Sequence, residues 1–299
     1  MSLEVGSLDL QEVACVLCGD ENGATRFTDG PFRVVDCPSC GLAYLSPRLV
    51  AGDLADLYQS DYWESHKARD FGYTDYRGDV DLYVRTFRRR MRLVDRFFAR
   101  PGRLLDVGCA AGAFLHVAGQ AGWQTQGVEV SAPIAEFARE RFGLDNITVG
   151  TLADVEAPED GYDLITMWDV IEHLPDPQAA LRQVWELLAP SGRLILETQN
   201  VTAPFARLMG RRWQHFKQPE HLIHLNPDTA ARLLGDCGFE VIENTSALGG
   251  KTISVEFLME RASRVSRALG ACMQVLRPLR KISFYANVFD EMVIVARPV

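Results

Sequence analysis

The chain has 299 residues, of which 47% are hydrophobic, enough to build one full α/β core with a small appended module. It has no run of about 18 apolar residues and no basic-then-apolar start. We therefore expect neither a membrane span nor export, and a cytoplasmic location. The 40 acidic residues outnumber the 31 basic ones, and the net charge of -9 disfavours a nucleic-acid partner.

Four of the seven cysteines form two Cys-x-x-Cys pairs near the N-terminus, Cys15 with Cys18 and Cys37 with Cys40, and a glycine follows each pair. This spacing is typical of a zinc ribbon, in which two turns bring four thiolates around one ion. Four thiolates leave no open coordination position, so the zinc would be structural. A pair of disulfides is the alternative, which the lack of an export signal disfavours. We assign residues 1–45 to this module.

Residues 46–82 are predicted to connect the ribbon to the main domain. The segment is rich in aromatic residues, which could cover a ligand as a lid or pack as an ordinary linker: Tyr58, Tyr62, Trp63, Phe71, Tyr73 and Tyr76. A helix is predicted over 83–98, because apolar residues recur there at helical spacing between arginines. The arginines could face phosphates or nucleic acid, but a solvated helix face is the preferred interpretation.

Strands and helices alternate through the main domain, residues 83–299, as in the doubly wound sheet of an α/β protein. Seven strands are predicted, over 103–107, 126–130, 147–149, 163–167, 193–197, 239–242 and 291–296. The helices between them are predicted over 112–119, 133–141, 178–188 and 229–237. Before the last strand, residues 249–283 form a basic, amphipathic helical insertion. It could rest on a membrane surface, but we favour packing as a lid or dimer face, since such apolar stripes mostly find protein partners.

The first strand runs into a small-residue turn with the pattern Asp106-x-Gly108-x-Ala110-x-Gly112, and Glu129 closes the second strand. A dinucleotide fold spaces glycines as G-x-G-x-x-G, so that a pyrophosphate can sit on bare amides. An acid at the strand end would repel a pyrophosphate. It suits a ligand that carries an ammonium and a sulfonium and no phosphate, namely S-adenosylmethionine. An unrelated strand-turn-helix is the alternative.

These motifs resemble those of the class I S-adenosylmethionine-dependent methyltransferases, whose sheet is Rossmann-like and has seven strands. The usual middle glycine of the turn is Ala110 here, which leaves the loop less freedom. The resemblance implies that Glu129 binds the ribose hydroxyls, that Asp154 accepts from the adenine amino group, and that Trp168 borders the methionine end. The full implied set for the cofactor and its product S-adenosylhomocysteine is Asp106, Gly108, Cys109, Ala110, Gly112, Glu129, Val130, Leu152, Ala153, Asp154 and Trp168.

Methyl transfer to an acceptor needs a base near the methyl group, and histidine suits this task at neutral pH. Residues 168–174 resemble the acid-x-x-Glu-His segment of quinone-biosynthesis-type methyltransferases, which makes His173 a candidate. Glu220-His221 resembles the Glu-His pair of sugar C-methyltransferases, which also carry an N-terminal zinc module. Those enzymes place tyrosine where this chain has Gln218. A structural hydrogen-bonding role is the alternative for each histidine, and it is preferred for the others in the 199–227 loop.

The predicted function is methyl transfer to a small-molecule or carrier-bound acceptor, such as a nucleotide-linked sugar or another natural-product intermediate. Asp169, Glu172 and His173 could also hold magnesium, although three mixed ligands make a weak case. Two alternatives stay open. An RNA methyltransferase would use the ribbon and the arginine-rich helices, and a non-catalytic adaptor would keep the fold alone. The acceptor and the oligomeric state cannot be read from the sequence.

Overall fold

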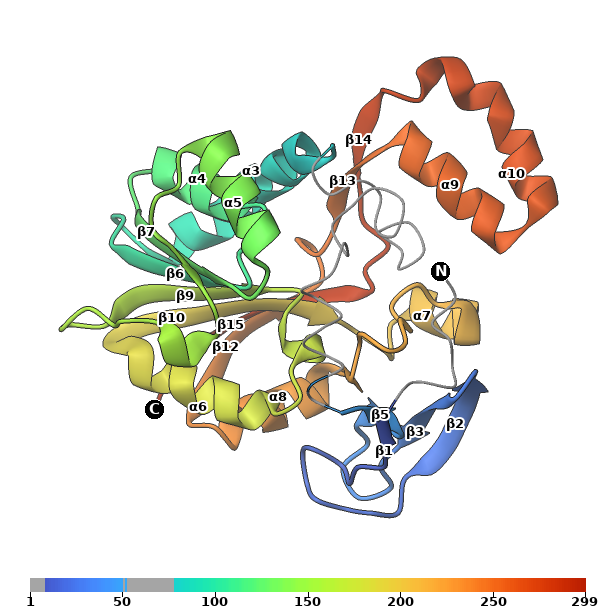
Figure 1. Ribbon diagram of the computed structural model, residues 1–299, viewed down its shortest axis with the longest axis horizontal. Coiled ribbons are helices and arrows are strands. Elements are labelled where there is room, and N and C mark those ends of the chain that lie inside the picture. Colours follow the sequence, from blue (N-terminus) through green and yellow to red (C-terminus); the bar gives the residue numbers. More distant parts are fainter. Residues whose placement is uncertain (1–8, 51, 53–77) are drawn as a thin grey trace.

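The computed structural model describes residues 9–50, 52 and 78–299, and its centre is a seven-stranded sheet (Figure 1). The strand order is β12-β15-β10-β9-β6-β7-β8. All seven predicted strands are present, and their bounds are β6 (Arg103–Val107), β7 (Gln124–Glu129), β8 (Ile147–Val149), β9 (Tyr162–Trp168), β10 (Leu188–Gln199), β12 (Phe239–Thr245) and β15 (Glu291–Pro298). The α/β fold class predicted from the sequence is therefore confirmed.

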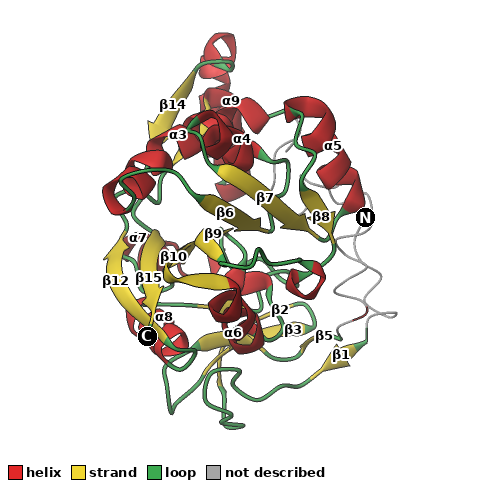
Figure 2. Cartoon of the chain, turned by 90° about the vertical axis from the view of Figure 1, so that its left-hand side faces the viewer, coloured by secondary structure: helices red, strands yellow, loops and turns green. Residues whose placement is uncertain are grey.

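Helices cover both faces of this sheet, as the alternation of elements predicts. In Figure 2 the helices α3 (Val80–Phe97), α4 (Ala113–Gln120) and α5 (Ala132–Phe142) lie above the strands. The helices α6 (Pro177–Leu187) and α8 (Pro227–Gly235) lie on the other side. Side chains alternate between the two faces along each strand. Leu104 and Leu164 pack with α3 and α4, whereas the next residues, Leu105 and Ile165, belong to the core that includes α6 and α8.

The strands adjoining the centre of the sheet are parallel, but β15 runs antiparallel to both β10 and β12. The chain continues from β6 to β7 on one side, while β9 lies against β6 on the other. The strand order therefore reverses between β6 and β9. In open α/β sheets the ligand binds outside the carboxyl ends of the strands at such a point. The fold thus places a binding site at the ends of these two strands.

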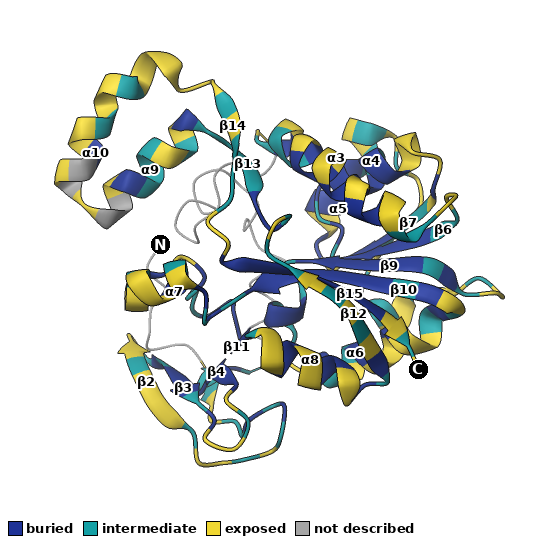
Figure 3. Ribbon diagram, turned by 180° about the vertical axis from the view of Figure 1, so that it is seen from behind, coloured by how far each residue is buried: buried dark blue, intermediate teal, exposed yellow. Residues whose placement is uncertain are grey.

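The N-terminal module forms two small sheets (Figure 1). Strands β1 (Leu10–Gln11) and β5 (Arg48–Leu49) make one of them. The other contains β2 (Ala24–Asp29), β3 (Phe32–Asp36) and β4 (Ala43–Leu45), so the hairpin expected between the cysteine pairs is present. A fourth strand, β11 (Ile223–His224), joins β4 from far along the chain (Figure 3). Sequence reasoning treated 199–227 as a loop and missed β11, α7 (Pro204–Met209) and the short helix η5 (Gly210–Arg212).

The insertion before the last strand is helical, as expected, but it stands on a β-hairpin stem that the sequence did not predict (Figure 1). The stem pairs β13 (Lys251–Ser254) with β14 (Ser283–Ala286). Between these strands lie α9 (Val255–Val265), α10 (Arg267–Met273) and η6 (Gln274–Leu279), with largely exposed surfaces (Figure 3). Within the described ranges, no helix has the length and apolar character needed to cross a bilayer. The aromatic residues of the expected connector lie outside the described residues.

Candidate functional site

The turn after β6 has the backbone that its small residues predict. Gly108, Ala110 and Gly112 all have positive φ, at 66°, 47° and 73°. A Cβ on Gly108 would come within 2.7 Å of a Val170 methyl, so only glycine fits there. Ala110 adopts the left-handed region with a side chain, which costs about 1 kcal/mol. The turn is therefore held in a fixed, slightly strained shape at the edge of the sheet.

Two buried carboxylates stand at the ends of β6 and β7. Glu129 accepts hydrogen bonds from the backbone amides of Ala110 and Ser131, both at 2.9 Å, and so ties the turn to the second strand. Asp106 accepts a hydrogen bond of 2.6 Å from the Thr166 hydroxyl. Burial, with a smaller contribution from the negative charge of Glu129, raises the pKa of Asp106 to about 8. The two acids predicted from the sequence thus lie at the ends of adjacent strands, and their contact with a cofactor stays a prediction.

A cavity lies beside the turn, between the end of β9 and helix α3. Trp168 packs in its wall against Phe87 and Phe114, with ring centroids 5.5 and 5.0 Å apart. The indole Nε1 of Trp168 is buried and has no hydrogen-bond partner among the described residues. The predicted cofactor residues that line this cavity are Asp106, Gly108, Cys109, Ala110 and Trp168. The cavity therefore combines a carboxylate, bare backbone and an aromatic wall.

The remaining cofactor residues predicted from the sequence lie around this cavity and do not line it. Gly112 is the N-cap of helix α4, and Val130 is 40% exposed beyond the end of β7. Residues Leu152, Ala153 and Asp154 form the short helix η3, whose Asp154 carboxylate accepts from the amide and hydroxyl of Thr151. Asp154 thus stabilises its own turn, and its contact with an adenine stays a prediction.

A network of charged side chains, which sequence reasoning missed, lines the cavity on its α3 side and includes Arg90, Asp169 and Lys251. Arg90 of α3 pairs with Glu197 of β10, and both side chains are almost completely buried. The ammonium of Lys251 lies 2.7 Å from Asp169 and 2.8 Å from Glu291. Although burial acts to raise the pKa of Asp169, the Lys251 charge holds it well below its usual value. The one available signal was the place of Arg90 on the apolar face of α3, three residues after Phe87.

Lys251 and Tyr83 also line a second cavity, between α3, the 199–227 segment and the stem of the insertion. His215 lies in this second cavity, with its Nε2 3.4 Å from Glu291 and 3.8 Å from Asp290. The two cavities are therefore neighbours that share Tyr83 and Lys251. This arrangement suits a reaction between two ligands.

The two histidines predicted as bases are brought together from distant parts of the chain. The rings of His173 and His221 meet edge to face, with centroids 4.6 Å apart. Burial lowers the pKa of His173 to about 4 and that of His221 well below its usual value. Both are therefore neutral near pH 7. Glu220 is buried beside them, at 1% exposure.

The magnesium set expected from the sequence is not formed. The ligand atoms of Glu172 and His173 lie within 4.8 Å of those of His221, whereas Asp169 groups with Glu197 and Glu291. The salt bridge to Lys251 explains this division, because it draws the Asp169 carboxylate toward the stem of the insertion. Asp169, Glu172 and His173 do not converge on one ion.

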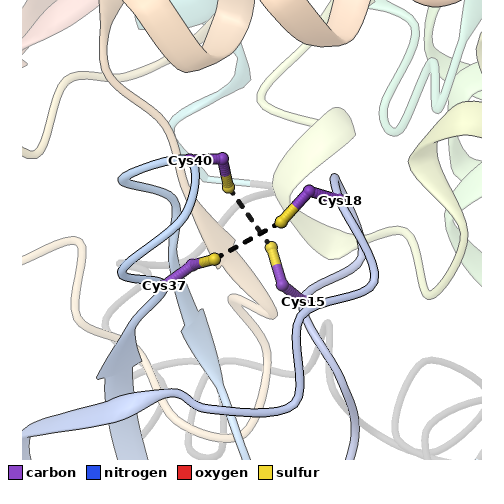
Figure 4. Close-up of side chains that lie close together, drawn as sticks. All are labelled: Cys15, Cys18, Cys37 and Cys40. Atoms are coloured by element: carbon purple, nitrogen blue, oxygen red, sulfur yellow. Dashed lines mark hydrogen bonds between the residues drawn. The ribbon is translucent and has the colours of Figure 1, made fainter.

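The four N-terminal cysteines converge on one point (Figure 4). The sulfur atoms of Cys15 and Cys40 lie 3.5 Å apart, those of Cys18 and Cys37 lie 3.4 Å apart, and all four lie within 4.8 Å of one another. Tetrahedral zinc with bonds of about 2.3 Å places its sulfur ligands about 3.8 Å apart. The glycines after each pair have positive φ, as tight turns of this kind require. The cluster therefore fits a structural zinc ion.

Comparison with known proteins identifies the family. A family model described as a methyltransferase domain matches residues 80–244, more than half of the chain. The chain belongs to the class I S-adenosylmethionine-dependent methyltransferases. The matched region of this methyltransferase begins with α3 and ends in β12. It contains both acids of the cofactor turn and both candidate bases, but not the ribbon.

Similar proteins agree with this assignment. A ubiquinone biosynthesis O-methyltransferase of Xanthomonas oryzae pv. oryzae is 33% identical over 132 residues, which cover 38% of this methyltransferase and 55% of the relative. The protein of the same name from Xanthomonas euvesicatoria pv. vesicatoria is 29% identical over 162 residues, 49% of this chain and 65% of the relative. The chain thus spans little more than half the length of these curated relatives.

Two solved structures share the fold. The 1,6-didemethyltoxoflavin-N1-methyltransferase of Burkholderia thailandensis has a TM-score of 0.53 at 15% identity, covering 92% of this chain and 99% of that one. The magnesium protoporphyrin IX methyltransferase of Synechocystis PCC 6803 has a TM-score of 0.51 at 16% identity, covering 84% of this chain and all of that one. At these identities the likeness extends to the fold alone.

Proposed function

We propose that this protein transfers the methyl group of S-adenosylmethionine to a small-molecule or carrier-bound acceptor. The observation that carries the proposal is the cavity at the ends of β6 and β9, where the buried Asp106 carboxyl lies beside bare backbone and Glu129 fixes the turn through the Ala110 amide. Such a site favours a phosphate-free, positively charged ligand. The Burkholderia neighbour was solved with S-adenosylhomocysteine and its acceptor bound, which supports the same use of this fold.

The residues of the first cavity fit the cofactor. The carboxylate of Asp106 would bind the ammonium group, and Glu129 would accept from the ribose hydroxyls while still holding the Ala110 amide. The buried, unpaired Trp168 Nε1 provides a donor in the wall of the same cavity. Leu152, Ala153 and Asp154 would flank the adenine. When bound, S-adenosylmethionine supplies a methyl carbon already activated by the sulfonium sulfur.

The acceptor would occupy the second cavity, which shares Tyr83 and Lys251 with the first. We assign its deprotonation to His221, which follows Glu220 in the chain and has His173 as its partner in ring contact. His221 is not among the residues that line the second cavity, whose histidine is His215. A histidine with a lowered pKa is neutral near pH 7 and can accept a proton at its free ring nitrogen. The Nδ1 atom of His221 is buried and makes no hydrogen bond to any described residue, so it is available for this role.

The names of the similar proteins support a small-molecule acceptor. The Xanthomonas relatives are named for ubiquinone biosynthesis, and the Burkholderia neighbour was solved with 1,6-didemethyltoxoflavin bound. We therefore place the acceptor among natural-product intermediates, free, carrier-bound or linked to a nucleotide. The four cysteines of the ribbon would bind one structural zinc ion.

The proposal is tested by binding before any acceptor is known. Isothermal titration calorimetry of the purified protein with S-adenosylhomocysteine should give one site per chain, and Glu129→Ala should weaken it. Glu136 on the neighbouring α5 is 59% exposed, so Glu136→Ala serves as the matched control. The assignment would be refuted if the wild type bound no S-adenosylhomocysteine. It would also be refuted if the Glu129→Ala variant bound S-adenosylhomocysteine as tightly as the wild type. Metal analysis should find one zinc per chain.

A further inference from the structure

The ribbon is built into the acceptor side of the methyltransferase site. Strand β11 pairs antiparallel with β4, with Ile223 opposite Tyr44 and His224 opposite Ala43. The carbonyl of Leu222 accepts a hydrogen bond of 2.9 Å from the Leu45 amide. Leu222, the residue that follows His221, is therefore hydrogen-bonded through its backbone to the ribbon sheet.

The same short segment is also fixed to the main domain. The Leu222 amide donates to the carbonyl of Glu172 at 2.8 Å, and Glu172 directly precedes His173. The side chain of Gln199, at the end of β10, donates to the Ile223 carbonyl and accepts from the Leu225 amide. Residues 222–225 thus lie between the ribbon and the end of the central sheet, hydrogen-bonded to both.

The metal-binding turns contact the other histidine segment as well. Gln178, at the start of α6, donates to the carbonyls of Val16 and Leu17 between the first two cysteines, at 3.2 and 3.1 Å. Arg48 of the ribbon donates to the carbonyl of Pro175. Both contacts fall within five residues of His173. The ribbon therefore contacts both segments that carry the paired rings, the one that follows His173 and the one that follows His221.

The cysteine cluster sets the position of β4. The Cys37 amide donates to the Leu42 carbonyl at 2.9 Å, and β4 begins at the next residue. Cys15, Cys37, Leu42 and Tyr44 pack in the same hydrophobic core as Ile223 and Leu225. Small zinc modules lose their fold without the metal, because thiolates alone do not hold the turns together. Loss of zinc would therefore remove the strand against which β11 pairs.

We propose that zinc in the ribbon positions the acceptor-side base, by holding β11 and the start of α6 so that His221 meets His173. The cofactor side lies on β6, β7 and β9, and the core between these strands and α3 and α4 contains no ribbon residue. On the other face, Val107 and Val128 share a core with Cys15 and Cys37 of the ribbon. The turn itself is fixed by hydrogen bonds from its own amides to Val128 and Glu129 of β7. Zinc should therefore control the conformation of the acceptor loop, residues 213–225, and leave cofactor binding intact. This inference rests on the proposed function, but its readout needs no acceptor.

Hydrogen exchange with mass spectrometry tests the inference on the full chain bound to S-adenosylhomocysteine. Removing zinc with a chelator should speed exchange at least tenfold in peptides from 213–225, and adding zinc back should restore it. Peptides from 103–112 should keep their protection, and the affinity for S-adenosylhomocysteine should change less than twofold. Cys37→Ser should behave like the stripped protein. Cys272→Ser, at an exposed cysteine of the insertion, should behave like the wild type.

A second variant keeps the test independent of ribbon unfolding. Phe27 of β2 packs edge to face on Phe216 of the acceptor loop, with ring centroids 4.8 Å apart. Phe27→Ala should retain one zinc and still speed exchange in 213–225. The inference is overturned if the stripped protein keeps its protection there, if cofactor affinity falls together with it, or if the chain takes up no zinc. Failure of the proposed function would instead appear as absent cofactor binding in the zinc-loaded protein.

Discussion

The protonation of Asp106 should control how tightly the cofactor binds. This carboxyl is only 2% exposed, and burial raises its pKa to about 8 despite the hydrogen bond from Thr166. In the free protein it is therefore mostly neutral at pH 6 to 7. The cofactor carries an ammonium and a sulfonium, which favour the ionised carboxylate. Binding should thus require the loss of a proton, and affinity should rise with pH.

The size of the effect follows from the pKa. Below the pKa of a raised acid, the ionised fraction increases tenfold for each pH unit, and the apparent affinity follows the competent fraction. We expect the dissociation constant of S-adenosylmethionine to fall about tenfold between pH 6 and pH 7. An α-amino group of pKa about 7.7 to 8.0 stays protonated over this range, so the ligand contributes little.

Calorimetry at the two pH values, in buffers of different ionisation enthalpy, measures both the affinity and the protons released. One proton should leave per cofactor bound at pH 6.5. Asp106→Asn should bind more weakly than the ionised wild type and show no pH dependence, whereas Glu136→Gln should follow the wild type. A constant affinity across the range, or an equal pH dependence in Asp106→Asn, would refute the role of Asp106.

Three further changes have definite expected outcomes. Glu129→Ala should weaken S-adenosylhomocysteine by about 1 to 3 kcal/mol, through lost charge-assisted hydrogen bonds, as calorimetry can measure. Arg90→Leu should lower the free energy of unfolding by about 3 to 5 kcal/mol in urea titrations, because it leaves Glu197 buried without its partner. Replacing both Arg90 and Glu197 by leucine should recover most of this loss. His221→Asn should slow turnover by about 100-fold or more with cofactor affinity unchanged, and unaltered kinetics would assign His221 a structural role.

The cofactor half of the site could be predicted because its determinants are local. Strand β6, the turn and the start of α4 are consecutive in the chain, and the turn needs small residues at positive φ that a reader can recognise. The ribbon could be predicted in the same way, since the spacing of two Cys-x-x-Cys turns by itself indicates their geometry. Glu129 could be proposed for a similar reason, because β7 is the next strand and ends beside β6.

The long-range contacts around the two cavities could not be predicted because they join residues that are far apart in the chain. Arg90 meets Glu197 across 107 residues, Lys251 meets Asp169 across 82, and Trp213 meets Asp290 across 77. A two-residue strand such as β11 has no periodicity of its own, and it forms only because β4 is present to pair with it.

The two halves of the site therefore differ in what stabilises them. The cofactor turn is held by hydrogen bonds from its amides to Val128 and Glu129 of β7, while the sheet beneath it shares one core with ribbon residues. The acceptor side uses side chains from α3, the 199–227 segment and the stem of the insertion, joined by Lys251. Changes in the ribbon or the insertion should then alter which acceptor binds while the cofactor site persists. Acceptor specificity can thus vary in this fold without new cofactor chemistry.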